Sequence, residues 1–170
     1  MDHRIEKTKQ SICNAFIELR SRKSLERITV KELCELAQIN KSTFYSHYVD
    51  IYDLSEQIES NIVSDIMSNL DNVADAIRNP SEFSNRLFLE YTKNPLIKII
   101  FSDSRREQLP KKLLSSIKEH VFANYPEYAD SLEKNIMLTY GVYGGYYTYQ
   151  DYDDSTAVKI ICEISKRIVF

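Results

Sequence analysis

The segment NKSTFYSHY, at positions 40–48, concentrates hydrogen-bonding side chains within nine residues. If it is helical, Phe44 and Tyr48 lie one turn apart on an inner face. The outer face then carries Lys41, Ser42, Thr43, Tyr45, Ser46 and His47. Such side chains donate to phosphates and can donate to or accept from base edges in a DNA groove. The segment therefore predicts a DNA-contacting helix, and the alternative is a solvated helix that happens to be polar.

The residues that precede this segment predict a helix that would position it. Thr29 and Glu32 have the spacing of a capping box at a helix start. The apolar positions of the helix that follows are Val30, Leu33, Cys34 and Ala37. Gln38-Ile39 forms a tight connection, and Asn40 is a good N-cap residue for the next helix, 41–48. Two short helices joined in this way form a helix-turn-helix, whose second helix enters the major groove.

The remaining residues also predict helices rather than strands. A first helix covers about 4–21, and Asp50 caps a fourth helix with a long apolar stripe. Proline-containing breaks then separate a helix that Ser81 could cap, the short run LIKIIF, a helix from Pro110 to about Tyr125, and helices near 128–150 and 154–169. We therefore expect an all-α protein of about nine helices, with the helix-turn-helix domain in residues 1–50 and a second helical domain in residues 51–170.

Composition limits the class of protein. No apolar run approaches the length of a membrane span, and the charged start MDHRIEKTKQ is unlike a secretory signal. Three isolated cysteines are typical of a reducing compartment, so we expect a cytoplasmic protein. The net charge of −3 is uneven, because residues 1–50 carry nine Lys/Arg against seven Asp/Glu and the remainder carries 13 against 18. No metal-ligand spacing, phosphate-binding glycine loop or coupled nucleophile and base occurs, so we expect no enzyme, no metal and no cofactor.

The segment ITVKELCELAQINKSTFYSHYVDIYDL resembles the DNA-binding signature of TetR/AcrR-family transcriptional regulators. The resemblance extends over residues 4 to about 60, and its most specific part is the run TFYSHY. It implies a homodimer that binds a pseudo-palindromic DNA operator, usually as a repressor, and often leaves the operator when a small-molecule effector binds. It also implies that residues 51–170 form a regulatory and dimerisation domain.

Positions carried over from the resemblance suggest roles for individual side chains. Thr43, Tyr45 and His47 correspond to phosphate or groove contacts, and Lys41, Ser42 and Ser46 to candidates for base edges. Thr29 and, more weakly, Lys31 correspond to phosphate contacts. Two positions depart from the family: the turn has Gln38 where glycine is common, and the fourth helix begins with Ile51 where lysine is common. We expect Gln38 to reach the groove itself, and Ile51 to remove one phosphate contact.

The second half is notable for its tyrosines and glycines. The segment 140–152 holds six of the twelve tyrosines, and all three glycines of the chain lie in it. A glycine inside a helix costs about 1 kcal/mol relative to alanine, so we expect another helix to approach closely there. By resemblance to the dimer bundle of the family, the predicted interface is Gly141, Gly144, Gly145, Ala157, Ile161, Ile164 and Ile168.

Aromatic side chains suit the wall of a ligand pocket. By resemblance to the helices that surround the ligand cavity of the family, the predicted lining is Phe88, Tyr91, Phe101, Met137, Tyr140 and Tyr143. The alternative is that these tyrosines are core or interface residues whose hydroxyls reach solvent. A second alternative concerns the function of the whole chain, which could be a co-regulator of the same fold that acts through a protein partner without its own ligand or strong operator binding.

Overall fold

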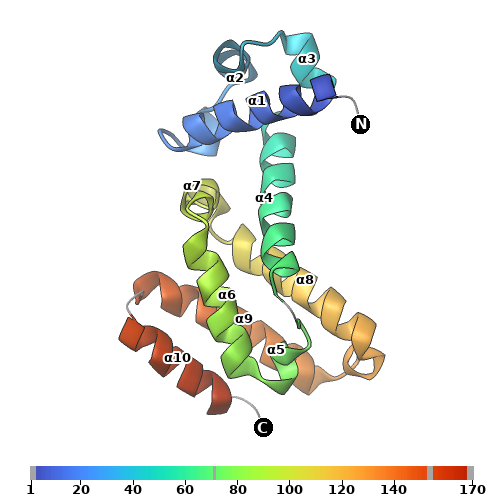
Figure 1. Cartoon of the computed structure of the whole chain (residues 1–170), viewed down its shortest axis with the longest axis vertical. Coiled ribbons are helices and arrows are strands. Elements are labelled where there is room, and N and C mark those ends of the chain that lie inside the picture. Colours follow the sequence, from blue (N-terminus) through green and yellow to red (C-terminus); the bar gives the residue numbers. More distant parts are fainter. Residues whose placement is uncertain (1–2, 71, 153–154, 168–170) are drawn as a thin grey trace. The chain divides into compact units, whose positions relative to one another are not determined.

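The computed structural model describes residues 3–70, 72–152 and 155–167. In those residues all regular structure is helical, with ten α-helices, three short 3₁₀ helices and no strand (Figure 1). The all-α prediction is confirmed. The helix beyond the expected nine is the four-residue α5 (Asp75–Arg78). The apolar stripe predicted for the fourth helix continues beyond Ser68, but α4 (Ile51–Ser68) ends there, and α5 follows as a separate helix.

The chain forms two compact units. The first runs to Ile62 and includes the later segment Pro95–Glu107, and the second comprises Val63–Asn94 and the residues from Gln108 onward. The first unit contains α1 (His3–Arg20), η1 (Leu25–Arg27), α2 (Val30–Ala37), α3 (Lys41–Tyr45), the beginning of α4, α7 (Leu96–Ile100) and η2 (Asp103–Arg105). In this unit α1 packs on α2 and on α7, and α2 packs on α3.

The first unit has a core built from the apolar stripes of its helices. Phe16 of α1, Leu33 of α2 and Phe44 of α3 are each fully buried. Full burial of a side chain of this size stabilises a fold by about 1.5–3 kcal/mol. The short helices α2 and α3 could not persist alone in water, so α2 is held by packing against α1, and α3 by packing against α2.

Two arginines join the segment Pro95–Glu107 to the rest of the first unit. The Arg20 side chain is fully buried, and it donates to the Ile99 carbonyl at 3.3 Å and to Ser102 Oγ at 2.6 Å. Arg105 Nε and Nη2 donate to the two carboxylate oxygens of Glu59, both at 2.6 Å. Glu59 is itself fully buried, and its hydrogen bonds raise the pKa of Arg105. A bidentate pair of this kind is strong and directional.

We predict that Arg105→Ala lowers the free energy of unfolding by about 3–5 kcal/mol, because it leaves the buried Glu59 carboxylate without its main partner. Urea denaturation measures this difference. The neighbouring substitution Arg106→Ala changes an exposed side chain and should cost less than about 1 kcal/mol. Equal effects of the two substitutions would contradict a structural role for the Glu59–Arg105 pair.

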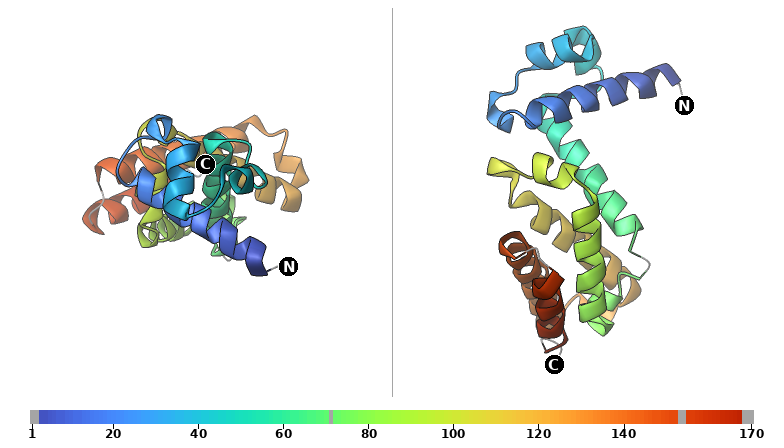
Figure 2. Two further views of the ribbon diagram at one scale, coloured as in Figure 1. Left: turned by 90° about the horizontal axis from the view of Figure 1, so that it is seen from above. Right: turned by 60° about the vertical axis from the view of Figure 1, so that its left-hand side comes forward.

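The second unit contains α5, α6 (Pro80–Lys93), α8 (Gln108–Asn124), η3 (Pro126–Tyr128), α9 (Leu132–Asp151) and α10 (Ser155–Arg167). Helix α10 packs on α6 and α9, and α8 packs on α9 (Figure 2). Pro80 occupies the first position of α6, where its missing N–H has no helical partner to lose. Ser81, which the sequence suggested as a cap, instead lies buried within the first turn, and Asn79 holds the N-cap position.

Candidate nucleic-acid interface and apolar cavity

The connection between α2 and α3 is a tight left-handed turn. Gln38 has φ 56° and ψ 45°, in the left-handed region. The Ile39 N–H donates to the Cys34 carbonyl at 3.0 Å, and the Gln38 N–H donates to the Glu35 carbonyl at 3.3 Å. This is the Schellman arrangement that ends many helices, usually with glycine at the left-handed position. Ser11 of α1 adds a hydrogen bond to the Ala37 carbonyl at 2.9 Å, so α1 also fixes the end of α2.

Helix α3 ends at Tyr45 and not at the predicted residue 48, and only part of the predicted outward set is exposed. Phe44 and Tyr48 are buried, with ring centroids 5.7 Å apart. The side chains at Lys41, Ser42 and Ser46 are exposed. Thr43 and His47, which were predicted as groove contacts, are half-buried.

Tyr45 is 56% exposed. Its ring lies edge-on to Phe44, with centroids 5.4 Å apart. The contact with a buried neighbour restrains an exposed side chain, so Tyr45 is presented in a defined orientation rather than as a freely rotating ring.

Hydroxyl groups around α2 and α3 differ in what they can still offer. Ser46 Oγ donates to the Thr43 carbonyl at 2.7 Å, so its oxygen is free mainly to accept. Thr29 Oγ accepts from the Glu32 N–H at 3.3 Å, which leaves its own O–H to donate. The Glu32 carboxylate pairs with Lys23. Lys31 lies 3.9 Å from Glu35 in an exposed pair, and such pairs are weak enough to yield to a phosphate.

The start of α4 carries features that the sequence analysis did not include among candidate site residues. Val49 is 79% exposed and Tyr52 is 54% exposed. Asp50 Oδ1 accepts from the Asp53 N–H and Asp53 Oδ2 accepts from the Val49 N–H, both at 2.8 Å. Hydrogen bonds from Gln57 and from the Val49 N–H lower the pKa of Asp53. Ile51 is buried, so this position contributes to the core and not to a phosphate contact.

We predict that Phe44→Ala costs about 3–5 kcal/mol of folding stability, whereas Tyr45→Ala costs about 1 kcal/mol or less, because it removes one edge-on ring contact from an exposed position. Thermal or urea unfolding of the two variants measures the contrast. A large loss for Tyr45→Ala would place its ring in the core.

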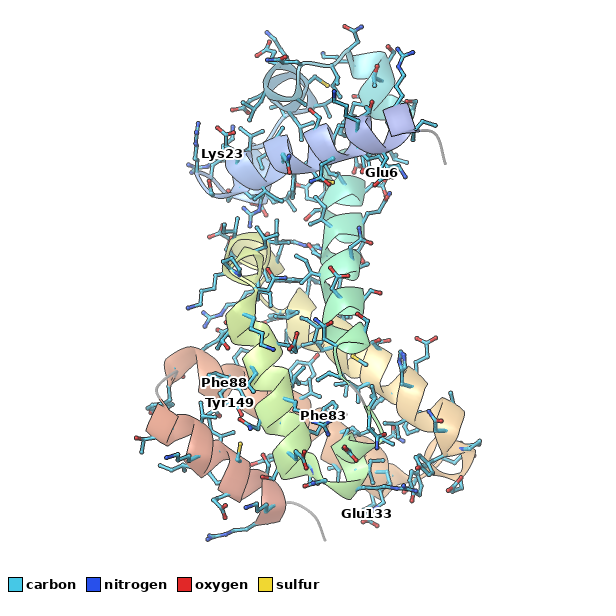
Figure 3. All side chains as sticks on the ribbon, in the orientation of Figure 1. Glu6, Lys23, Phe83, Phe88, Glu133 and Tyr149 are labelled. Carbon is cyan, nitrogen blue, oxygen red and sulfur yellow. The ribbon has the colours of Figure 1, made fainter. Side chains whose placement is uncertain are left out.

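The second unit contains an apolar cavity of about 80 Å³ between α6, α8 and α9. Of the residues predicted to line a pocket, Phe88, Tyr91 and Met137 do so. Phe101 is buried in the first unit, Tyr140 is 62% exposed on α9, and Tyr143 is half-buried beside Tyr147. The prediction missed further lining residues: Phe83, Ser84, Leu113, Leu138, Tyr146 and Tyr149. Phe83, Phe88 and Tyr149 are labelled in Figure 3.

One part of the cavity wall is polar. Ser84 Oγ and Tyr149 Oη lie 3.1 Å apart and share a hydrogen bond. The Tyr149 ring packs against Phe88, with centroids 4.3 Å apart. Burial raises the pKa of Tyr149 to about 12, although the hydrogen bond with Ser84 acts in the opposite direction. The phenol is therefore neutral near pH 7 and keeps its proton.

The glycines of α9 do not accommodate a close helix neighbour within the chain. A Cβ atom at Gly141 would meet nothing within 4 Å, and one at Gly145 would meet only the Tyr149 ring at 3.8 Å. Both glycines line the cavity. Gly141 and Gly144 are both exposed, whereas Gly145 is half-buried, and a Cβ atom at Gly144 would meet only the Tyr140 ring at 4.0 Å.

The other residues of the predicted dimer interface are distributed between core and surface. Ile161 is buried with Phe88 and Tyr149 in a cluster inside the second unit, which leaves little of it for a partner. Ile164 is 49% exposed, and Ala157 is half-buried. Ile168 lies outside the described residues.

Comparison with models of known protein families and with curated protein sequences found no significant match to this chain. Within the described ranges, no cluster of three or more His, Cys, Asp or Glu residues could hold a metal ion. None of the helices described is long and apolar enough to span a membrane.

Proposed function

We propose that this chain is a TetR-like transcriptional regulator that binds a pseudo-palindromic DNA operator as a homodimer. It acts as a repressor, and a small-molecule effector releases it. The observation that carries the proposal is the α2–turn–α3 geometry, in which a left-handed turn and two buried aromatic rings hold a short helix with its polar side chains outward.

The outward side chains of α3 suit hydrogen bonding to DNA bases as well as electrostatic attraction to phosphates. Lys41 supplies a cation, and Ser42, Ser46 and Tyr45 supply groups that can donate or accept at base edges or phosphates. Thr29 at the start of α2 can donate to the DNA backbone. Each recognition helix of a dimer would enter one of two major grooves about 34 Å apart on the same side of the duplex.

An apolar surface on α9 and α10 supports the homodimer. Ile136, Tyr140 and Tyr147 on α9 are all at least 39% exposed. They are separated by four and seven residues, about one and two helical turns, and so lie on one face of α9. Helix α10 adds Ile160 and Ile164, which are 55% and 49% exposed. Large exposed apolar side chains gathered on neighbouring helices are typical of a protein interface.

The first test is binding of the purified chain to the DNA upstream of its own gene against a scrambled duplex, at two salt concentrations. We predict a specificity ratio of about 10³ or more.

Lys41→Ala should lower the slope of log affinity against log salt by about one unit per protomer, since each lost phosphate contact removes roughly 0.9. Tyr45→Ala should weaken specific binding while the fold persists.

Lys98→Ala provides the matched control, because Lys98 is an exposed lysine on α7 of the same unit. Its salt slope should equal that of the unaltered chain. A specificity ratio near one, or equal slopes for Lys41→Ala and Lys98→Ala, would contradict the proposed role of α3.

Assembly is tested separately from DNA binding. We predict that the chain is a dimer by light scattering and that Ile164→Asp converts it to a monomer, because a carboxylate cannot be buried unpaired at an apolar interface. Ile5→Asp is the control, since Ile5 on α1 is exposed to a similar degree, 45%, and should leave the dimer intact. Monomers in all three samples would exclude the proposed interface.

A specific observation favours the second candidate function, a co-regulator of this fold that acts through a protein partner. The Asp50 carboxylate accepts from the Asp53 N–H in the first turn of α4, and the Asp53 carboxylate accepts from the Val49 N–H just before the helix. The negative charge of these two side chains opposes a phosphate at this helix start. A DNA affinity that depends on salt but not on sequence would favour this candidate.

A further inference from the structure

We propose that the cavity of the second unit binds a small, uncharged, mainly apolar ring compound that carries one hydroxyl or carbonyl group. The structure assigns the polar group of this ligand to Ser84 and Tyr149, and its ring to the aromatic wall formed by Phe83, Phe88 and Tyr91. Binding of such a ligand stands independently of DNA binding, whereas its effect on an operator complex rests on the proposed function.

The lining of the cavity argues that the ligand has no net charge. Its walls are formed by aliphatic and aromatic residues, serines, glycines and a proline, and none of the lining residues is Asp, Glu, Lys, Arg or His. A carboxylate or ammonium group would lose its water there without gaining an opposite charge, which is strongly unfavourable. A neutral molecule escapes this penalty.

The polar group of the ligand is expected at one end of the cavity. Ser84 and Tyr149 are lining residues whose hydroxyl oxygens are 3.1 Å apart. The Tyr149 hydroxyl also forms a hydrogen bond with the Cys162 thiol. The Ser84 hydroxyl can still offer a donor or an acceptor to a third group. A ligand hydroxyl or carbonyl at this point would complete the hydrogen bonding of the pair.

The two glycines in the cavity wall contribute to the open volume of the cavity, because they carry no side chain that could fill it. Gly141 and Gly145 lie inside α9, where each costs about 1 kcal/mol of helix stability relative to alanine. Gly145 is half-buried in the cavity wall, and a Cβ atom there would meet only the Tyr149 ring, at 3.8 Å. The absence of a side chain at this position therefore leaves cavity volume, which a ligand can use.

The volume suits a small ring. A single buried water needs roughly 10–15 Å³ of the same kind of space, and the cavity offers about 80 Å³. Its flat aromatic walls favour a planar apolar molecule over a branched one, because rings stack or pack edge-to-face with good contact.

Calorimetric titration of the full chain, without DNA, with four compounds of similar size tests the proposal. The probes are 4-ethylphenol, ethylbenzene, 4-ethylbenzoate and 4-ethylbenzylammonium. At pH 7 we expect 4-ethylphenol to bind at least tenfold tighter than the anion or the cation. Tyr149→Phe should reduce the preference for 4-ethylphenol over ethylbenzene by roughly three- to tenfold, the value of one hydrogen bond. No binding of any probe, or equal binding of a charged probe, would overturn the proposal.

Two glycine variants separate cavity filling from loss of the fold. Gly145→Leu should abolish binding while the melting temperature stays the same or rises, because leucine is a better helix former. Gly144→Leu changes an exposed glycine of the same helix outside the cavity wall, and it should bind 4-ethylphenol as the unaltered chain does. Retained binding in Gly145→Leu would overturn the assignment to this cavity. Because these titrations contain no DNA, their failure is distinguishable from failure of operator binding.

Discussion

The buried Glu59–Arg105 pair is the interaction on which the architecture of the first unit depends. It attaches a segment from the middle of the chain to α4, and Arg20 attaches the same segment to α1. A buried carboxylate and guanidinium gain little net stability over an apolar pair, but they tolerate few alternative arrangements. Helices α1–α3 are therefore not a free-standing N-terminal module, because the core of their unit includes the buried side chains of Ile97 and Ile100 of α7.

This arrangement also determines how the chain connects the two candidate sites. The sequence leaves α6, which lines the cavity, enters the first unit as Pro95–Glu107, and returns as α8, which also lines the cavity. Under the proposed function, an effector could act on the regulator only if it binds one conformation of these helices better than another. The chain joins the two units through this arginine-anchored segment and through α4, which continues from Ile62 to Val63 and carries the lining residue Ile66.

Local features of the first unit could be predicted from the sequence, whereas its long-range pairing could not. The caps that Asp50 forms on α4 and Thr29 forms on α2 each span only three residues, so the local sequence is enough to predict them. Phe44 and Tyr48 share a face because they are four residues apart, about one helical turn. The bonds from Arg20 and Arg105 instead span 79 and 46 residues. In a highly charged segment such as RREQLPKK, residues 105–112, nothing in the sequence indicates which charged side chain becomes buried.

The glycines of α9 show a second reason why the sequence alone does not predict the structure. A missing side chain can have two opposite structural consequences. It can permit close approach of another helix, which the sequence suggested, or it can leave space unfilled beside a cavity, as at Gly145. Both require the same residue, so only the tertiary surroundings distinguish them.

The tyrosines of α9 pose a similar problem. Tyr140 and Tyr149 belong to one run on one helix, but Tyr140 is exposed and Tyr149 lines the cavity. Helical periodicity separates these two faces, but it does not say which face meets the core, because tyrosine suits both environments.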